Sequence, residues 1–333
     1  MSLYFHGYGE KGLQFQMILR ILLTCFLFFY ASNVQGMFED NNKCKWEEKN
    51  SMPTSRSEFS SVTDGKNIYV LGGIKESKAL SNFEIYNSTT DAWRELSSLP
   101  ISVHHGAIGI VNNKIYLIGG FTDVTWTRPN KHIFEYDIQN DLWKKYDELL
   151  ITRVGHTLEV VDNQILIIGG HGYKPSRILK YNITNKKISE IDSMMPSPAD
   201  HLASIIYNDN IIILGGRNGS GNLNVIRIFK LKKNQWLYND GLPFSISGHI
   251  AEIVDNKIHL AGGENIDKNI TSKAHWIFDI KKNKWEESID LPLGLHGLGS
   301  GIIDNTLYIF GGASEAGKKT YNSTQNKIYL LKC

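Results

Sequence analysis

The pair Gly-Gly recurs six times in this chain, at intervals of 46 to 50 residues, and each pair ends a short apolar run. The pairs begin at Gly72, Gly119, Gly169, Gly215, Gly262 and Gly311. A period near 50 residues that is built from short strands is typical of a β-propeller or another repeat array. The repeat therefore bounds the architecture, but it does not name a ligand.

Each unit reads as four strands without a sustained helical period. In the second unit, runs rich in Ile, Val and Tyr follow one another from about residue 105 to Trp143, and turn residues separate them. Asn, Asp and Gly tolerate the positive φ of tight hairpins, and such a pair occupies the first turn of every unit. These pairs are Asp64-Gly65, Asn112-Asn113, Asp162-Asn163, Asp209-Asn210, Asp255-Asn256 and Asp304-Asn305. We predict an all-β fold.

A tryptophan recurs at the unit boundaries, as Trp46, Trp93, Trp143, Trp236 and Trp285, and Ile188 takes its place in one unit. Together with the Gly-Gly pairs, Tyr136-Asp137 and Phe278-Asp279, these residues resemble the kelch repeat. The resemblance covers residues 44–333 and implies a six-bladed β-propeller with four antiparallel strands per blade. It implies no reaction, because kelch propellers serve as binding modules, scaffolds and occasional enzymes.

The two chain ends together complete one repeat. The segment 278–285 reads FDIKKNKW, and YLLKC at 329–333 followed by CKW at 44–46 fills the same eight positions. The strand that carries Trp46 should therefore close the last blade, and a Cys44–Cys333 disulfide should replace the missing turn. The alternative is a pair of free thiols that flank the seam.

The N-terminus predicts export. Met17–Gly36 contains Arg20, an apolar run over 21–30 and then small or polar residues, which is a secretory signal pattern too short to span a bilayer. We expect a secreted or periplasmic protein whose domain, residues 44–333, has no membrane span once residues 1–36 are removed. An uncleaved anchor is the alternative. Residues 1–16 are unusual ahead of a signal, so the start is either Met1 or Met17.

Composition excludes some partners. The chain is 41% hydrophobic and 21% charged, with a net charge of +2. It contains no basic stripe of the kind that would predict binding to nucleic acid or to a membrane surface. We expect a monomer. Glycosylation sequons at Asn87, Asn182, Asn218, Asn269 and Asn322 do not distinguish a eukaryotic extracellular protein from a bacterial periplasmic one.

Polar residues concentrate on one predicted face, where the loops after Gly-Gly meet the loops before each innermost strand. Loops on a rigid frame commonly carry binding residues. The expected funnel residues are Arg56, His104, His105, Arg153, His156, Asp200, His201, Arg217, His249 and His296, and Glu58 gathers with Arg56 on the same face.

Three interpretations of these residues stay open. The pattern Arg153–His156 resembles the kelch repeat, where such side chains tie neighbouring blades. Arginine and histidine also suit an anionic or polyhydroxylated ligand such as a sugar. A zinc site would need nitrogens about 2.0–2.1 Å from the ion. Because histidines on separate blades start far apart and differ in register, we expect no metal and no cofactor.

The leading function hypothesis is a binding or interaction module for a protein or small molecule, because no nucleophile–base pattern, zinc motif or phosphate loop is present. The alternative is a sugar-processing enzyme, since Gly263-Glu264 resembles N-acetylneuraminate epimerases (sialic acid mutarotases). That resemblance implies Glu264 as proton acceptor and Arg217 or Arg56 as carboxylate binder, although Lys268 and Asn269 stand where such enzymes carry an arginine. A galactose-oxidase-type copper enzyme needs a cysteine–tyrosine bond, and both mature cysteines lie at the seam.

Overall fold

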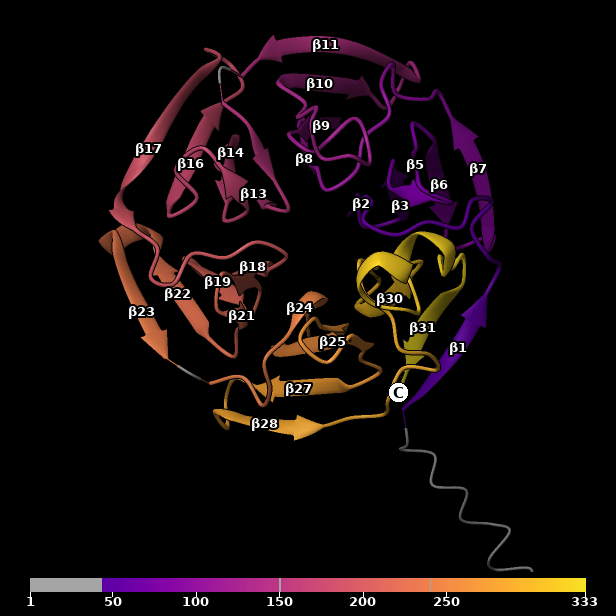
Figure 1. The fold of residues 1–333 in the computed structure, drawn as a ribbon, viewed down its shortest axis with the longest axis vertical. Coiled ribbons are helices and arrows are strands. Elements are labelled where there is room, and N and C mark those ends of the chain that lie inside the picture. The colour runs from indigo at the N-terminus through magenta and orange to yellow at the C-terminus, as the bar shows by residue number, and fades with distance from the viewer. Residues whose placement is uncertain (1–43, 150, 240) are drawn as a thin grey trace, which may run out of the picture. The chain divides into compact units, whose positions relative to one another are not determined.

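Each apolar run before a Gly-Gly pair forms the second strand of a four-stranded antiparallel sheet in the computed structural model. The structure describes residues 44–149, 151–239 and 241–333. The leader 1–36 lies outside these residues, so its prediction stands as made. Within Lys45–Lys332, six sheets surround a common centre as the blades of a propeller (Figure 1).

The blades follow one another along the chain, each with its first strand innermost. The first blade contains β2 (Ser60–Thr63), β3 (Asn67–Leu71), β6 (Phe83–Asn87) and β7 (Ala92–Leu96). The second contains β8 (Ala107–Val111), β9 (Lys114–Ile118), β10 (His132–Asp137) and β11 (Leu142–Glu148). The third contains β13 (Thr157–Val161), β14 (Gln164–Ile168), β16 (Arg177–Asn182) and β17 (Lys187–Met194). The fourth contains β18 (Ala203–Tyr207), β19 (Asn210–Leu214), β22 (Ile226–Lys230) and β23 (Gln235–Asn239).

The last two blades complete the circle. The fifth contains β24 (Ser247–Val254), β25 (Lys257–Asn265), β27 (His275–Asp279) and β28 (Lys284–Glu287), and β26 (Ile270–Thr271) pairs with β25. The sixth contains β29 (Gly299–Ile303), β30 (Thr306–Phe310), β31 (Ile328–Lys332) and β1 (Lys45–Lys49). Short pairs in the loops are β4 (Ile74–Lys75) with β5 (Lys78–Ala79), β12 (Arg153–Val154) with β15 (His171–Gly172), and β20 (Arg217–Asn218) with β21 (Gly221–Asn222). The helices of the described residues are the 3-10 turns η1 (Leu231–Lys233) and η2 (Gly317–Asn322).

The seam prediction is confirmed. β1 pairs antiparallel with β31, with Trp46 opposite Leu331, so the N-terminal strand is the outermost strand of the last blade. Cys44 directly precedes β1, Cys333 directly follows β31, and a disulfide joins the two cysteines. A turn in the other five blades is thus replaced here by a covalent bond.

The apolar core lies between neighbouring blades, as the tryptophans predict. In one cluster, Phe83 of the first blade meets Tyr136 of the second edge to face, with ring centroids 4.7 Å apart. The indole N–H of Trp143 donates to the Ser97 carbonyl of the chain that joins these two blades. Such aromatic contacts bury large apolar areas and satisfy the polar edge of the indole.

The first glycine of the Gly-Gly pair allows two blades to approach. At Gly119, with φ +68°, a Cβ would lie 2.1 Å from the carbonyl oxygen of Arg153 in the next blade. The N–H of Gly120 donates to that same carbonyl. A side chain at this position would therefore separate the blades.

The hairpin turns confirm the sequence pattern with one shift. Asn112 and Asn113, for example, both have φ between +50° and +60°. In the fourth blade the turn falls at Asn208-Asp209, one residue before the expected pair, because Asn210 already pairs in β19. Within the described residues, no helix has the length and apolar character needed to cross a bilayer.

Candidate functional site

Six residues, five from the loops before the innermost strands and Gly248 from the start of β24, form a closed ring of backbone hydrogen bonds. Each N–H donates to the carbonyl of the ring residue in the preceding blade, at 2.8–3.0 Å, and each residue has φ between +49° and +62°. The ring residues are Glu58, His105, Gly155, His201, Gly248 and Gly297. We call this set the ring. Since three of its members are glycine, only three side chains point from it toward the axis.

The ring separates two hollows along the propeller axis. Residues that follow the ring in the chain line a cavity of about 700 Å³ between the innermost strands, which we call the channel. The side chains of the ring itself line a smaller hollow of about 210 Å³ on the loop face, which we call the funnel. Both hollows are wholly within the six-bladed unit.

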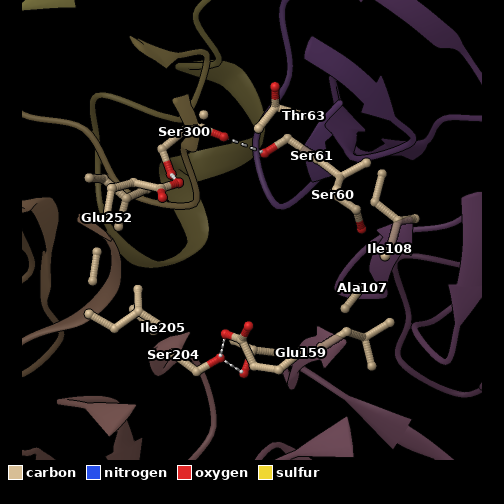
Figure 2. A pocket seen from close by; sticks show the side chains of 18 of the residues that line it. Ser60, Ser61, Thr63, Ala107, Ile108, Glu159, Ser204, Ile205, Glu252 and Ser300 are labelled. Carbon is tan, nitrogen blue, oxygen red and sulfur yellow. Dashed lines mark hydrogen bonds between the residues drawn. The ribbon is translucent and has the colours of Figure 1, made fainter. Parts of the chain in front are cut away.

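The channel contains two glutamates that the sequence analysis missed (Figure 2). Glu159 accepts a hydrogen bond from Ser204 Oγ, and Glu252 accepts one from Ser300 Oγ, each at 2.7 Å. In both pairs the serine belongs to the blade that follows the glutamate. Burial raises the pKa of each carboxyl to about 7, and the mutual repulsion of the two carboxylates adds to the shift at Glu159.

A comparison of the six repeats in ring register would have revealed these glutamates. Each lies four residues after its ring residue, where the other blades have Val62, Gly109, Ile205 and Gly301. The sequence therefore did carry a sign of this pair, because two of the six repeats have an acidic residue at a position where the others have a small or apolar one. This sign stayed hidden because the ring register was unknown.

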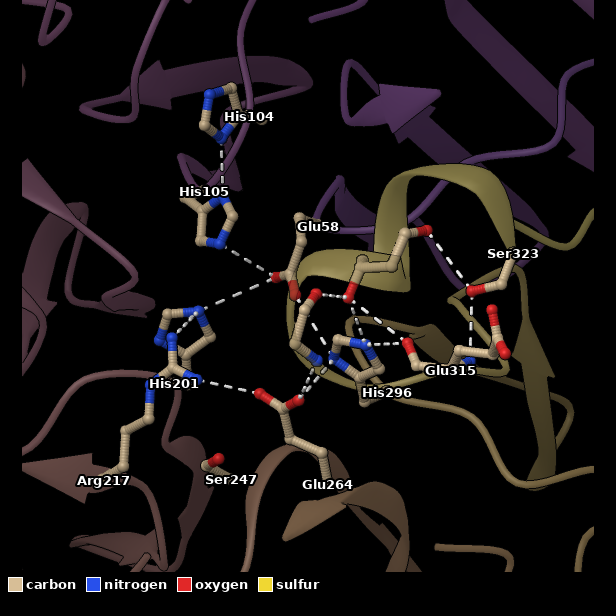
Figure 3. Close-up of polar contacts among 12 residues, drawn as sticks. Glu58, His104, His105, His201, Arg217, Ser247, Glu264, His296, Glu315 and Ser323 are labelled. Carbon is tan, nitrogen blue, oxygen red and sulfur yellow. Dashed lines mark hydrogen bonds and ion pairs between the residues drawn. The ribbon is translucent and has the colours of Figure 1, made fainter. Parts of the chain in front are cut away.

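The funnel brings together three side chains of the ring (Figure 3). Glu58 Oε2 lies 3.3 Å from Nε2 of His105 and 3.9 Å from Nε2 of His201. The three side chains are buried or nearly so, with 12%, 4% and 8% of their areas exposed. Glu58 was expected on this face beside Arg56, and it takes the ring position of the first blade as His105 and His201 do in theirs.

Burial alone would raise the pKa of Glu58. The nearby His105, His201 and His296, together with the Arg217 guanidinium, outweigh that effect and lower it to about 2. Burial holds the pKa of His105 well below its ordinary value, so this imidazole is neutral near pH 7. The Glu58 carboxyl at the floor of the funnel is therefore ionised at neutral pH.

Arg217 is the centre of an ion-pair network on the funnel wall. Its Nε donates to Asp200 Oδ1 at 3.0 Å, and its Nη1 donates to Glu264 Oε1 at 2.8 Å. The backbone builds this network, because Asp200 and Arg217 pair in an antiparallel bridge just after the Gly-Gly pair. The Nε and Nη1 groups, which could otherwise bind an anionic ligand, thus already donate to carboxylates of the chain itself.

Glu264 and His296 complete the wall. Glu264 is 2% exposed, and its Oε2 lies 3.7 Å from Nδ1 of His296. His296 Nε2 lies 3.0 Å from the Thr320 hydroxyl in η2. Of the expected residues, the structure thus gathers His105, His201, Arg217, Glu264 and His296 around one hollow. Asp200 lines an adjoining hollow and contacts His201 and Arg217.

Two expected funnel arginines lie inside the blades instead. Arg56 is 0% exposed, forms an ion pair with Glu84 at 2.5 Å and donates to the Gly72 carbonyl. Arg153 is 1% exposed and donates to the carbonyls of Gly169 and Lys174. These guanidiniums hold backbone carbonyls together, as the kelch interpretation of Arg153 implied, and they do not reach a ligand on the loop face.

Two expected histidines are also structural. His156 and His249 follow the ring by one residue, and each imidazole packs against the Gly-Gly pair of the preceding blade. A Cβ at Gly119 would lie 2.7 Å from Cε1 of His156, and one at Gly215 would lie 2.8 Å from Cε1 of His249. Burial lowers the pKa of both imidazoles to about 3, so they are packed as neutral groups.

His104 supports the funnel from behind. Its Nε2 lies 2.7 Å from the Asp123 carbonyl, and its Nδ1 lies 2.6 Å from Nδ1 of His105. Trp126, in the loop after the second Gly-Gly pair, packs edge to face on both histidines, with ring centroids 5.2 and 4.6 Å away. Trp126 is 42% exposed and has φ +62°, so the loop holds a strained aromatic residue at the funnel mouth.

Family models agree with this architecture. The KLHDC2/KLHL20/DRC7 Kelch-repeats domain matches residues 104–285, and the Kelch motif matches residues 55–100. Since the first match covers more than half of the chain, the protein belongs to the kelch-repeat family.

Curated relatives carry the same kind of domain. Kelch-like protein terF of Aspergillus terreus is 29% identical over 237 residues, which are 65% of this chain and 51% of that protein. Kelch-like protein 38 of Rattus norvegicus is 24% identical over 234 residues, or 68% of this chain and 38% of that protein. The Kelch repeat and BTB domain-containing protein 1 of Horsepox virus is 32% identical over 100 residues, or 29% and 17%. The chain thus spans about half or less of the relatives that it matches.

Proposed function

We propose that this chain is a protein-binding module that docks a segment of its partner on the loop face, over the funnel. Kelch propellers typically serve as protein-interaction modules, and the matched relatives are named as kelch-like proteins. The observation that carries the proposal is the composition of the funnel mouth. Exposed Trp126 and Ile266, at 42% and 38%, line the same hollow as the buried polar groups.

This arrangement matches the anatomy of protein interfaces. A tryptophan that is partly exposed in the free protein gains much apolar burial when a partner covers it, and tryptophan is enriched among interface residues that carry binding energy. The polar wall beneath it offers hydrogen bonds at the centre of the contact. The funnel mouth therefore has an apolar anchor and a polar recognition surface side by side.

The sugar-processing alternative receives no support from the described residues or from the relatives. Glu264 is ion-paired with Arg217, and Arg56 is buried inside the first blade. The two groups that were to move a proton and hold a sugar carboxylate are thus committed to other contacts.

We also propose that the protein works outside the cytoplasm, as the signal pattern at 17–36 predicts. The Cys44–Cys333 disulfide supports this, because disulfides persist mainly in oxidising compartments. Intact mass measurement of the protein secreted by its host should give a mature chain that begins at Met37. Recovery of a full-length chain from the cytosol would contradict export.

A peptide selection tests the binding proposal. Random peptides displayed on phage are selected on the immobilised protein, and the enriched peptides are measured against variants by fluorescence polarisation. We expect Trp126→Ala to weaken binding by at least about 10-fold, as for an interface hot spot. Leu142→Ala, which truncates a more exposed apolar side chain on β11, is the control and should bind normally. No enrichment, or equal binding by Trp126→Ala, would refute the proposal.

A further inference from the structure

We propose that Glu58, His105 and His201 bind one divalent transition-metal ion of the zinc type at the floor of the funnel. One donor atom from each residue lies within 4.8 Å of the other two. The closest approach is 3.3 Å, between Glu58 Oε2 and His105 Nε2. A shift of the side chains by about an ångström would bring all three atoms to coordination distance from a common ion.

The ring brings histidines of separate blades close together, which was not expected from the sequence. Histidines on separate blades were expected to start far apart, but the ring hydrogen bonds draw their backbones to the axis. As a result the imidazoles of His105 and His201 have centroids only 4.9 Å apart. Two imidazole nitrogens and one carboxylate oxygen are a donor set that borderline divalent ions favour, and three protein ligands leave positions open toward the funnel.

Hydrogen bonding fixes the tautomer of His105. The Asp123 carbonyl can only accept, so Nε2 of His104 must donate to it. Neutral His104 then presents a lone pair on Nδ1, which accepts from Nδ1–H of His105. The free lone pair of His105 is therefore on Nε2, and it faces the carboxylate of Glu58.

His201 is oriented in the same way by a different partner. Its Nδ1 lies 2.5 Å from Asp200 Oδ1, and a carboxylate oxygen accepts the proton. Its Nε2 lies 3.2 Å from Nη2 of Arg217, which can only donate, so Nε2 carries a lone pair, and it lies 3.9 Å from Glu58 Oε2. A carboxylate or other acceptor behind a histidine commonly fixes the ring of a metal ligand in this manner.

The lone pair of His105 Nε2 and the Glu58 carboxylate face each other at 3.3 Å without a hydrogen atom between them, so they repel one another. A cation placed among the three donor atoms removes this repulsion. Apart from the imidazoles, the described side chains that line the funnel and the adjoining hollow around Trp126 and Asp200 hold three carboxylates, of Glu58, Asp200 and Glu264, against one guanidinium, of Arg217. The remaining two negative charges match a divalent ion.

An ion that binds Nε2 of His201 must displace Arg217 from that nitrogen. The Nη2 of Arg217 lies 3.2 Å from Nε2 of His201 and shares that lone pair. The Arg217 side chain is 23% exposed and lies on the funnel wall, so it has room to turn aside while it keeps Asp200 or Glu264 as a partner. The metal site is therefore open to ions from the loop face.

The test uses untagged full-length protein, calorimetric titration with Zn²⁺ and the visible spectrum of added Co²⁺. We expect one site per chain and d–d absorption bands typical of a low-symmetry nitrogen and oxygen site. Glu58→Gln and His105→Gln should each weaken Zn²⁺ binding by at least about 10-fold, since even loss of an outer partner of a metal ligand costs that much. His171→Ala, which removes an exposed imidazole beside the funnel, should bind as the unmodified protein does.

Circular dichroism of both variants checks that the propeller still forms. His105→Gln keeps the ring backbone unchanged, so it remains informative if Glu58→Gln does not fold. Absence of saturable Zn²⁺ binding to the unmodified protein would overturn the proposal. Binding that His105→Gln leaves intact, or that His171→Ala abolishes, would also overturn it, because the ion would then lie elsewhere.

Discussion

The backbone N–H of Glu58 donates to the carbonyl of Gly297 at 2.9 Å, and this bond joins the first blade to the last within the ring. The other five bonds of the ring repeat the contact between consecutive blades. The six left-handed residues thus form a continuous hoop that fixes where the funnel floor lies. Their side chains, or the lack of them, decide what the funnel contains.

Substitution of Gly297 should lower the free energy of unfolding more than substitution of Gly248. Alanine at either position adds about 1–2 kcal/mol of backbone strain, because both have positive φ. At Gly297 the Cβ would also lie 2.6 Å from Glu58 Oε1, whereas at Gly248 the nearest atom is 3.5 Å away. Denaturant unfolding should therefore rank Gly297→Ala below Gly248→Ala in stability. Equal losses of stability for the two variants would show that the Glu58 side chain does not pack against Gly297.

The buried ion pair of Arg56 and Glu84 should be costly to break. Both side chains are 0% exposed, and burial lowers the pKa of Arg56 and raises that of Glu84 in spite of their pairing. Glu84→Ala leaves a guanidinium buried without its partner and should lower the free energy of unfolding by about 3–5 kcal/mol.

Two variants check this explanation. Arg56→Met combined with Glu84→Leu removes both charges, so it should be more stable than Glu84→Ala alone. Asp290→Ala breaks an exposed ion pair with Lys273 and should cost less than about 1 kcal/mol. If the double variant is the least stable of the three, the charge explanation is wrong.

The channel glutamates should make stability fall as the pH rises. Their pKa is about 7 in the folded protein and about 4.5 in the unfolded chain, so the folded state binds more protons between these values. Their contribution is fully present below pH 4.5 and is lost as the pH rises through about 7. Glu159→Gln combined with Glu252→Gln should therefore be more stable than the unmodified protein at pH 8, by up to about 3 kcal/mol for each carboxyl.

The comparison must be a difference between proteins at each pH. Buried histidines such as His156 and His249 have lowered pKa values and change stability in the opposite sense below pH 6.5. The advantage of the double variant should disappear near pH 5, while Glu287→Gln on exposed β28 should show no such trend. An advantage that is equal at pH 5 and pH 8 would contradict the assignment.

Loss of the Cys44–Cys333 disulfide should destabilise the whole propeller. The bond spans a sequence separation of 289 residues, for which chain entropy gives at most about 5 kcal/mol of stabilisation. Replacement of both cysteines by serine should lower the guanidinium unfolding midpoint to that of the unmodified protein with its disulfide reduced. Free thiols at both positions in the oxidised protein, found by alkylation and mass spectrometry, would refute the bond.

A difference of one residue in register decides which surroundings each histidine of the loop face has. His104, His105 and His156 all precede an innermost strand and looked equivalent in the sequence. The structure turns His105 toward the axis, places His104 behind it and buries His156 between blades. Strand alternation alone predicts which residues share a face, but the ring decides which loop residue meets the axis.

The sequence by itself determined the six-bladed architecture, the hairpin turns, the seam at Trp46 and the pairing of Cys44 with Cys333. These features depend on local backbone preferences and on a repeat that is visible along one chain. Only the tertiary structure decided that Arg56 serves the blade interior, that Glu58 joins His105 and His201, and that Glu159 and Glu252 share a channel. The reason is physical: those contacts join different blades, and their distances follow from how six sheets close around an axis.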